Sequence, residues 1–177
     1  MTHIAFYGGS FNPPTIAHEA IVNHLIKQTT FDKVIVKPCG TRQDKPELLQ
    51  TLDSRRIRVT EKLSRNNPHY HLDLRAMEKP MVPTIQEWQN LRSQNPNSTI
   101  YFVTGSDLFI VESDGLCQIE KWIEGITLFS EAYFYIFPRP FEGKIKYPPN
   151  HCLVDNFTPI NISSSELRKR ETLEGSN

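Results

Sequence analysis

The sequence predicts an α/β protein built on a mostly parallel sheet. Apolar runs typical of strands alternate along the chain with segments of helical periodicity, which is the pattern of βαβ units. Most of these strand-like runs end at a glycine, a proline or a polar turn. The chain has 177 residues, a length that favours one domain over residues 1–177. We expect its C-terminal part, from about residue 160, to be helical.

The first half of the chain supplies two strands and two helices. Residues 3–7 are apolar and run into two glycines, which predicts a buried strand. Residues 15–29 predict a helix, and its apolar positions are Ile16, Ala20, Ile21 and Leu25. Residues 33–36 are β-branched and stop at a proline, as a strand does. A polar surface loop over 39–52 leads to a helix that begins at residue 53 or 54.

The second half continues the alternation. Residues 69–74 alternate in polarity and predict a strand, and residues 84–94 predict a helix stopped by Pro96-Asn97. The apolar run 99–103 ends at a glycine and predicts another strand. A shorter helix over 118–125 is expected to bury Ile119, Trp122 and Ile126. An aromatic strand over 132–137, a proline-rich loop over 140–150 and a last helix over 163–170 complete the series.

Bulk properties exclude several classes of protein. The formal net charge is zero, so a general attraction to nucleic acid or to a membrane surface is not expected. Three widely spaced cysteines form no CxxC pair, which disfavours a disulfide framework or a zinc site. No apolar run approaches the ~20 residues of a membrane span. The first residues lack a basic and then apolar leader, so we expect a cytoplasmic protein.

Three loops are expected to meet at one edge of the sheet. In an open parallel sheet, ligands bind beyond the carboxyl ends of the strands, at the point where the strand order reverses. The loops are residues 8–14, residues 105–107 and the approach to Ser163, and all are rich in small or polar residues. We therefore expect a ligand site there.

The loop after the first strand has the composition of an anion site. Gly8 and Gly9 can adopt positive φ and admit a ligand to the backbone, while the following prolines stiffen the exit. The helix that follows presents its positive dipole end, and Thr15 and His18 share one of its faces. A phosphate site and an ordinary turn with a structural histidine are both compatible with these residues alone.

The sequence "ISSSELRKR", residues 162–170, offers a second helix start rich in hydroxyl groups. Ser163 or Ser164 can cap the helix, and Arg168, one turn inside, can reach back to a phosphate. A capped surface helix with a solvated basic face is the alternative.

Taken together, the two ends resemble a known enzyme superfamily. "GGSFNPPTIAH" resembles the GxFxPxHxGH or TxGH signature of nucleotidylyltransferases, and "ISSSELR" resembles their ISSTxxR signature. Intermediate pieces, among them "VIVKP", "PTIQEW", "YFVTGSDLF" and "PRP", make the chain most similar to the nicotinate/nicotinamide mononucleotide adenylyltransferases. The resemblance covers about residues 3–170. It implies a Rossmann-like, doubly wound sheet.

The resemblance also implies a reaction and a set of site residues. The 5′-phosphate of a pyridine mononucleotide would attack the α-phosphorus of ATP and release pyrophosphate. His18, Thr15, Arg168 and Lys45 match the catalytic positions. The ATP-binding positions are matched by Gly8, Gly9, Ser10, Phe11, Gly105, Asp107, Ile162, Ser163 and Ser164. Thr84 and Lys45 match the mononucleotide side.

Further expectations concern the metal and the acceptor. Mg²⁺ would arrive with ATP, held mainly by phosphate oxygens, so no protein metal cage is predicted. The family's ring-stacking tryptophan is replaced near Leu116 or Cys117, while Trp88 and Trp122 are expected in the core. The choice between nicotinate and nicotinamide stays open. So do another acceptor such as phosphopantetheine, a CTP-dependent reaction, and a nucleotide-binding module without turnover.

Overall fold

The computed structural model describes residues 1–27, 30–40, 68–77, 79–160 and 162. Within them, strands pair in the order β3-β2-β1-β4-β5-β6, and every pairing is parallel. The strands are β1 (Thr2–Gly9), β2 (Lys33–Pro38), β3 (Tyr70–Leu72), β4 (Ser98–Gly105), β5 (Tyr133–Phe137) and β6 (His151–Leu153). This is the order of a doubly wound, Rossmann-like sheet, with its reversal between β1 and β4. The predicted fold class is confirmed.

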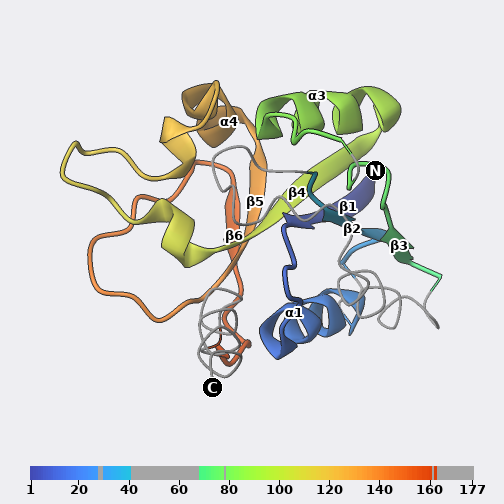
Figure 1. The fold of residues 1–177 in the computed structure, drawn as a ribbon, viewed down its shortest axis with the longest axis horizontal. Helices are drawn as coiled ribbons and strands as arrows, with labels where there is room; N and C mark the ends of the chain where they lie inside the picture. Colours follow the sequence, from blue (N-terminus) through green and yellow to red (C-terminus); the bar gives the residue numbers. More distant parts are fainter. Residues whose placement is uncertain (28–29, 41–67, 78, 161, 163–177) are drawn as a thin grey trace, which may run out of the picture.

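Helices cover both faces of the sheet (Figure 1). Helix α1 (Ile16–Lys27) lies on one face, and α3 (Thr84–Gln94) and α4 (Gly125–Glu131) lie on the other. Two short 3-10 helices, η2 (Ser106–Phe109) and η3 (Ile119–Lys121), follow β4. Right-handed crossovers explain the two faces, because the chain moves outward in one direction from β1 to β3 and then in the other from β4 to β6.

The alternation of side chains along β1 divides the core into two layers. Ile4 and Phe6 pack with the buried residues of α3 and α4. Ala5 and Tyr7 pack with the buried residues of α1. All four side chains are buried, so β1 is a central strand with both faces covered. The buried face of α1 is formed by Ala17, Ile21, Val22 and Leu25. Ile16, expected on this face, is 59% exposed because it lies in the first turn of α1, off the buried stripe.

The helix expected over 118–125 is wrong in its placement. Residues Ile119–Lys121 form only a short 3-10 turn, and the α-helix begins at Gly125. Between them Glu124 has a φ of 51°, a left-handed conformation that a continuous helix does not contain. Ile126 is consequently 65% exposed, whereas Trp122 is partly buried against the core as expected.

Most of the other expected helices and strands agree with the structure, and one observed strand has no expected counterpart. The helix over 84–94 matches α3, and the remaining expected strands match β1 to β5 within a few residues. Strand β6 was not expected, since its three residues are all exposed and form an edge. The helix from residue 53 or 54, the last helix over 163–170 and most of the 39–52 loop lie outside the described residues. No helix in the described part of the chain has the length and apolarity to cross a membrane.

Candidate active site

The carboxyl ends of β1 and β4 lie side by side at the reversal of strand order. The register places Phe6 of β1 opposite Phe102 of β4, so Gly8–Gly9 and Gly105 end neighbouring strands at one edge. Gly105 is in turn opposite Phe137, the last residue of β5. This arrangement brings together two of the three expected loops, the first loop and the turn after β4. The segment after β5 lies beside them, whereas Ser163, the end of the third expected loop, lies outside the described residues.

The two glycines of the first loop act differently from the expectation. Gly8 and Gly9 continue strand β1, and positive φ among the described glycines occurs at Gly115 and Gly143. What these two glycines contribute to the loop is the absence of a side chain. A Cβ on Gly8 would lie 3.1 Å from the ring of Phe6, and one on Gly9 would lie 3.2 Å from the ring of Phe11. Because Gly8 and Gly9 carry no side chain, the rings of Phe6 and Phe11 can pack close to them while the backbone of this strand end stays uncovered.

Phe11 is the residue that takes the unusual backbone conformation in this loop. Its φ is 45°, and its side chain is only 2% exposed. The ring meets those of Tyr7 and His18 edge-on, with centroid distances of 5.2 and 5.0 Å. The ring of Phe11 is thus part of the core below the loop, and it supports the imidazole of His18 from one side.

Thr15 and His18 form a closed pair at the start of α1. The N–H of Thr15 donates to Nδ1 of His18 at 2.9 Å, and the threonine hydroxyl lies 3.1 Å from the same nitrogen. The N–H of His18 donates back to Oγ1 of Thr15 at 3.3 Å, which makes Thr15 the N-cap of α1. Because Nδ1 accepts a hydrogen bond, the neutral imidazole carries its proton on Nε2.

The surroundings of His18 favour this neutral form. Burial, and next the positive charge of Arg139, lower the pKa of His18 from 6.5 to about 4. Near pH 7 the ligand-free protein therefore holds an uncharged imidazole whose Nε2 is a hydrogen-bond donor. Thr15 is only 6% exposed, so its main effect on this site is to orient the ring.

Arg139 is a site residue that the sequence analysis missed. It follows β5 directly, and its N–H donates to the hydroxyl of Ser106 at 2.9 Å. Its Nε lies 3.9 Å from Oδ1 of Asp107, and the side chain keeps 29% of its surface exposed. The segment Pro138-Arg139-Pro140, directly after a buried strand, is the local pattern that could have identified it.

Gly105 allows the turn after β4 to close over its own backbone. A Cβ at this position would overlap the carboxylate of Asp107 and lie 3.1 Å from Arg139. Ser106 is buried, whereas the side chain of Asp107 is 51% exposed. The carboxylate of Asp107 and the guanidinium of Arg139 thus lie beside the backbone of Gly105, which carries no side chain.

On the acceptor side, Thr84 is the first residue of α3 and is partly buried. The ring-stacking position was expected near Leu116 or Cys117. Cys117 is fully buried, whereas Leu116 is partly buried, so of these two residues Leu116 is the one with exposed surface. Trp88 is 6% exposed within the α3 layer, so its expected core role is confirmed.

Several expected site residues receive no test from this geometry. Lys45, Ser163, Ser164 and Arg168 lie outside the described residues. Ser10 is partly buried, and Ile162 is partly buried with its N–H bonded to the carbonyl of Ile160 at 2.9 Å. Among the residues described, no group of three or more His, Cys, Asp or Glu side chains is arranged to hold a metal ion.

Comparisons with known proteins agree with this arrangement. Residues 6–170 match the model of the cytidylyltransferase-like family. A probable nicotinate-nucleotide adenylyltransferase from Fusobacterium nucleatum is 27% identical over 174 residues, covering 94% of this chain and 86% of the relative. The nicotinate-nucleotide adenylyltransferase of Bacillus subtilis is 25% identical over 172 residues, covering 96% and 86%.

A solved structure extends the likeness to three dimensions. The nicotinic acid mononucleotide adenylyltransferase of Plasmodium falciparum, complexed with NaAD, superposes with a TM-score of 0.77 at 29% identity. The superposition covers 96% of this chain and 83% of that one. The match spans the sheet, both helical layers and the carboxyl edge described above.

Proposed function

The chain belongs to the cytidylyltransferase-like family, and from this premise we propose that it transfers the adenylyl group of ATP to nicotinate mononucleotide. One observation carries the proposal. A neutral His18, oriented by Thr15 at the N-terminus of α1, packs against Phe11 in the loop that follows the glycine end of β1. A helix N-terminus and a fixed N–H donor beside open backbone are suited to phosphate groups. The adenylyltransferase relatives and the solved complex with NaAD support this choice of reaction.

The chemistry is a displacement at phosphorus. An oxygen of the mononucleotide 5′-phosphate forms a new bond to the α-phosphorus of ATP. The bond from that phosphorus to the oxygen bridging to the β-phosphorus breaks, and pyrophosphate leaves with that oxygen. The protein needs no covalent intermediate; it positions the two phosphates and stabilises the charge that develops on their oxygens.

The described residues divide this work. His18 donates from Nε2 to a phosphate oxygen, with the positive end of the α1 dipole behind it. Arg139, whose guanidinium keeps part of its surface open beside Asp107, adds a fixed cation near the same phosphates. Gly8, Gly9 and Ser10 offer backbone to ATP, with Phe11 as the packed support below.

The remaining assignments rest on the family resemblance. Gly105 and Asp107 would lie beside the adenosine, and Thr84 would contact the mononucleotide. Lys45, Ser163, Ser164, Arg168 and Ile162 would complete the phosphate clamp. The described groups that face the phosphates in this proposal are a neutral imidazole and a guanidinium, which are donors to oxygen. We therefore expect Mg²⁺ to enter as part of the MgATP substrate and to be held mainly by phosphate oxygens.

The direct test is a coupled measurement of both products. The purified chain is given MgATP with nicotinate mononucleotide, and dinucleotide and pyrophosphate are quantified; equal amounts of both are expected. In parallel reactions, nicotinamide mononucleotide or phosphopantetheine replaces nicotinate mononucleotide, or CTP replaces ATP. Dinucleotide from neither pyridine mononucleotide would overturn the proposal. ATP binding without any turnover would instead indicate a nucleotide-binding module.

A further inference from the structure

A cleft of about 830 Å³ lies on the α3 side of the sheet, along the β2–β3 edge. Apolar groups such as Phe6, Ile35 and Leu91 share its lining with charged ones. Of the proposed catalytic residues that the structure describes, Thr15, His18 and Arg139 do not line this cleft. Its charged residues nevertheless connect, through strand β2 and helix α3, to the site where the acceptor is expected.

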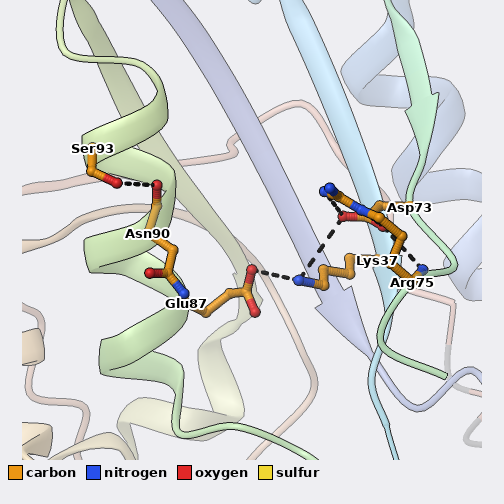
Figure 2. Close-up of polar contacts among 6 residues, drawn as sticks. All are labelled: Lys37, Asp73, Arg75, Glu87, Asn90 and Ser93. Atoms are coloured by element: carbon orange, nitrogen blue, oxygen red, sulfur yellow. Dashed lines mark hydrogen bonds and ion pairs between the residues drawn. The ribbon is translucent and has the colours of Figure 1, made fainter. Parts of the chain in front are cut away.

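Lys37 forms the centre of this charged group (Figure 2). Its side chain comes from the end of β2 and reaches across to α3, where Nζ contacts Oε1 of Glu87 at 2.5 Å. The same nitrogen lies 3.9 Å from Oδ2 of Asp73, which follows β3. All three side chains are only 15% exposed, so water screens the contact weakly. One ammonium group therefore links the ends of two strands to the start of a helix.

Asp73 has a second cationic partner, and this changes what Lys37 can do. Arg75 donates to Asp73 from Nε at 2.9 Å and from Nη2 at 2.8 Å. The side-chain hydrogen bonds from Arg75 are the main reason why the pKa of Asp73 lies below its usual range. With Asp73 satisfied in this way, the short contact of Lys37 is the one to Glu87. The side chain of Arg75 is 81% exposed, and its charge interacts mainly with Asp73 and secondarily with Glu87.

The Lys37–Glu87 contact bridges two groups of the proposed site. Lys37 is the register partner of Gly8 on β1. Glu87 lies one helical turn after Thr84 on α3, on the same side of the helix. The ring of Phe6 fills the space between, 3.1 Å from where a Cβ of Gly8 would be. The ion pair thus spans the distance between the ATP loop and the acceptor helix.

Apolar packing alone does not define how α3 sits along the sheet. Ile85, Trp88 and Leu91 bury the helix against the core, but hydrophobic contact is not directional. The first residue of α3 is preceded by Pro83, which gives no side-chain cap. A short, largely buried ion pair is directional, so the Lys37–Glu87 contact is suited to define the rotation and the height of the first turn of α3.

We propose that Lys37 is a positioning residue that holds the first turn of α3, through Glu87, at the correct distance from Gly8. The inference rests on the proposed function and deepens it, because it assigns the acceptor half of the site a support built from an ion pair. The substrate affected is the pyridine mononucleotide, whose contact at Thr84 moves with α3. ATP, held by the first loop and the segment after β4, is not affected directly.

The test compares four variants in steady-state kinetics with each substrate varied in turn. K37M and E87Q each remove the ion pair, and we expect the KM for the mononucleotide to rise about tenfold, as small misplacements do. The KM for ATP and kcat should change far less. K37R, which keeps the charge, should recover most of the loss. The matched control is K33M, which removes a lysine that lines the same cleft from the other end of β2 and should leave both KM values unchanged.

A second readout separates this inference from the proposed function. Backbone hydrogen exchange of residues 84–90 should accelerate in K37M and E87Q but not in K33M, with or without an identified acceptor. The double variant K37M/E87Q should be no worse than either single variant, since both remove one interaction.

Three outcomes overturn the inference while the proposed function stands. One is an active wild type whose mononucleotide KM is the same in K37M. Another is K33M with the same loss as K37M. The third is equal loss for both substrates, which indicates a general structural role. Should K37M fail to fold, E87Q against K37R decides the same question. A wild type without dinucleotide synthesis refutes the proposed function, and exchange at 84–90 then still decides whether Lys37 holds α3.

Discussion

At the residue scale, a single threonine combines two tasks at the start of α1. The hydroxyl of Thr15 caps the helix, and its backbone N–H selects the tautomer of His18. The same imidazole is supported by the ring of Phe11 and held neutral by burial and by Arg139. The donor at Nε2 is therefore oriented before any substrate binds, which lowers the cost of reorganisation during the reaction.

The ionisation of His18 provides the first prediction. R139Q should raise the pKa of His18 above its value of about 4, because one of its two causes is removed. The pKa should stay below 6.5, since burial remains. Titration of the ligand-free protein by NMR measures both values. R92Q is the control, as Arg92 stacks over Trp88 on the α3 side; an equal shift in both variants would contradict the assignment.

The role of His18 in the reaction gives a second prediction. H18A should reduce kcat by about 10²-fold or more, the usual effect of losing one donor to developing charge. Some thermal stability should be lost as well, because the N–H of Thr15 loses its acceptor and Phe11 loses its contact with the ring, so rates are compared where the variant is folded. Product formation under saturating substrates measures the effect. An unchanged rate would show that His18 does not contact the transferring phosphates.

Thr15 gives a third prediction, which separates capping from catalysis. T15A should lower the free energy of unfolding by about 1 kcal/mol through loss of the cap. It should also lower kcat, because His18 loses the hydroxyl beside Nδ1. T15S keeps the hydroxyl and should restore both. Urea unfolding and steady-state rates supply the two measurements, and a T15S variant as impaired as T15A would argue that the methyl group matters instead.

At the element scale, the segment between β4 and β5 depends on close backbone approach. Helix α4 starts at Gly125 directly against η3, with the N–H of Gly125 bonded to the carbonyl of Trp122 at 2.9 Å. Nearby, Glu120 is buried and accepts hydrogen bonds from Lys146 at 2.6 Å and from the N–H of Cys117 at 3.0 Å. These contacts hold the segment between β4 and β5 to the core.

This close approach makes the effect of a single methyl group predictable. A Cβ at Gly125 would overlap the carbonyl oxygen of Ile119, and backbone cannot move as a flexible side chain can. G125A should lower the free energy of unfolding by more than about 3 kcal/mol, in the range of severe core strain. G115A is the comparison: Gly115 has a φ of 79° but open space around it, so about 1–2 kcal/mol is expected. Urea unfolding of both variants gives the contrast, and equal losses would contradict it.

At the scale of the whole molecule, titrating groups on both faces of the sheet act on stability in the same direction. The pKa values of His18, His24 and His71 are lowered, in each case mainly by burial. Asp73 and Glu120 also have lowered pKa values. For Asp73 the main cause is hydrogen bonding from Arg75; for Glu120, hydrogen bonds and the charge of Lys146 outweigh burial, which by itself raises the pKa.

These shifts predict a two-stage loss of stability in acid. Below pH 6.5 the unfolded chain binds protons at histidines that the folded protein keeps neutral, so stability falls from pH 6.5 toward about 4. Below the ordinary carboxyl pKa, the contributions of Asp73 and Glu120 are lost as the pH passes through their lowered folded values. Thermal unfolding from pH 8 to 3 measures this. H18Q should flatten the first stage, and an unchanged slope there would contradict the buried neutral His18.

Local patterns in the chain were sufficient for the order and type of most elements. Helix α3 and strands β1 to β5 follow from periodicity, because a buried stripe or strand must be written in consecutive residues. The proposed anion site at Gly8–His18 also rests on a local feature, a helix start after a glycine-rich strand end. The family resemblance of the two end motifs then narrowed the chemistry to nucleotidyl transfer.

Other features exist only once strands become neighbours. Arg139 acts on His18 because β5 pairs with β4, and Lys37 meets Glu87 because α3 crosses above β2. The spacing of these residues along the sequence gives no sign of either interaction. The buried position of Cys117 and the left-handed turn at Glu124 likewise depend on packing of η3 and α4 against the core. Sequence periodicity indicates which side of each helix or strand is apolar. The parallel pairing of distant strands decides which polar residues meet at the carboxyl ends of the strands.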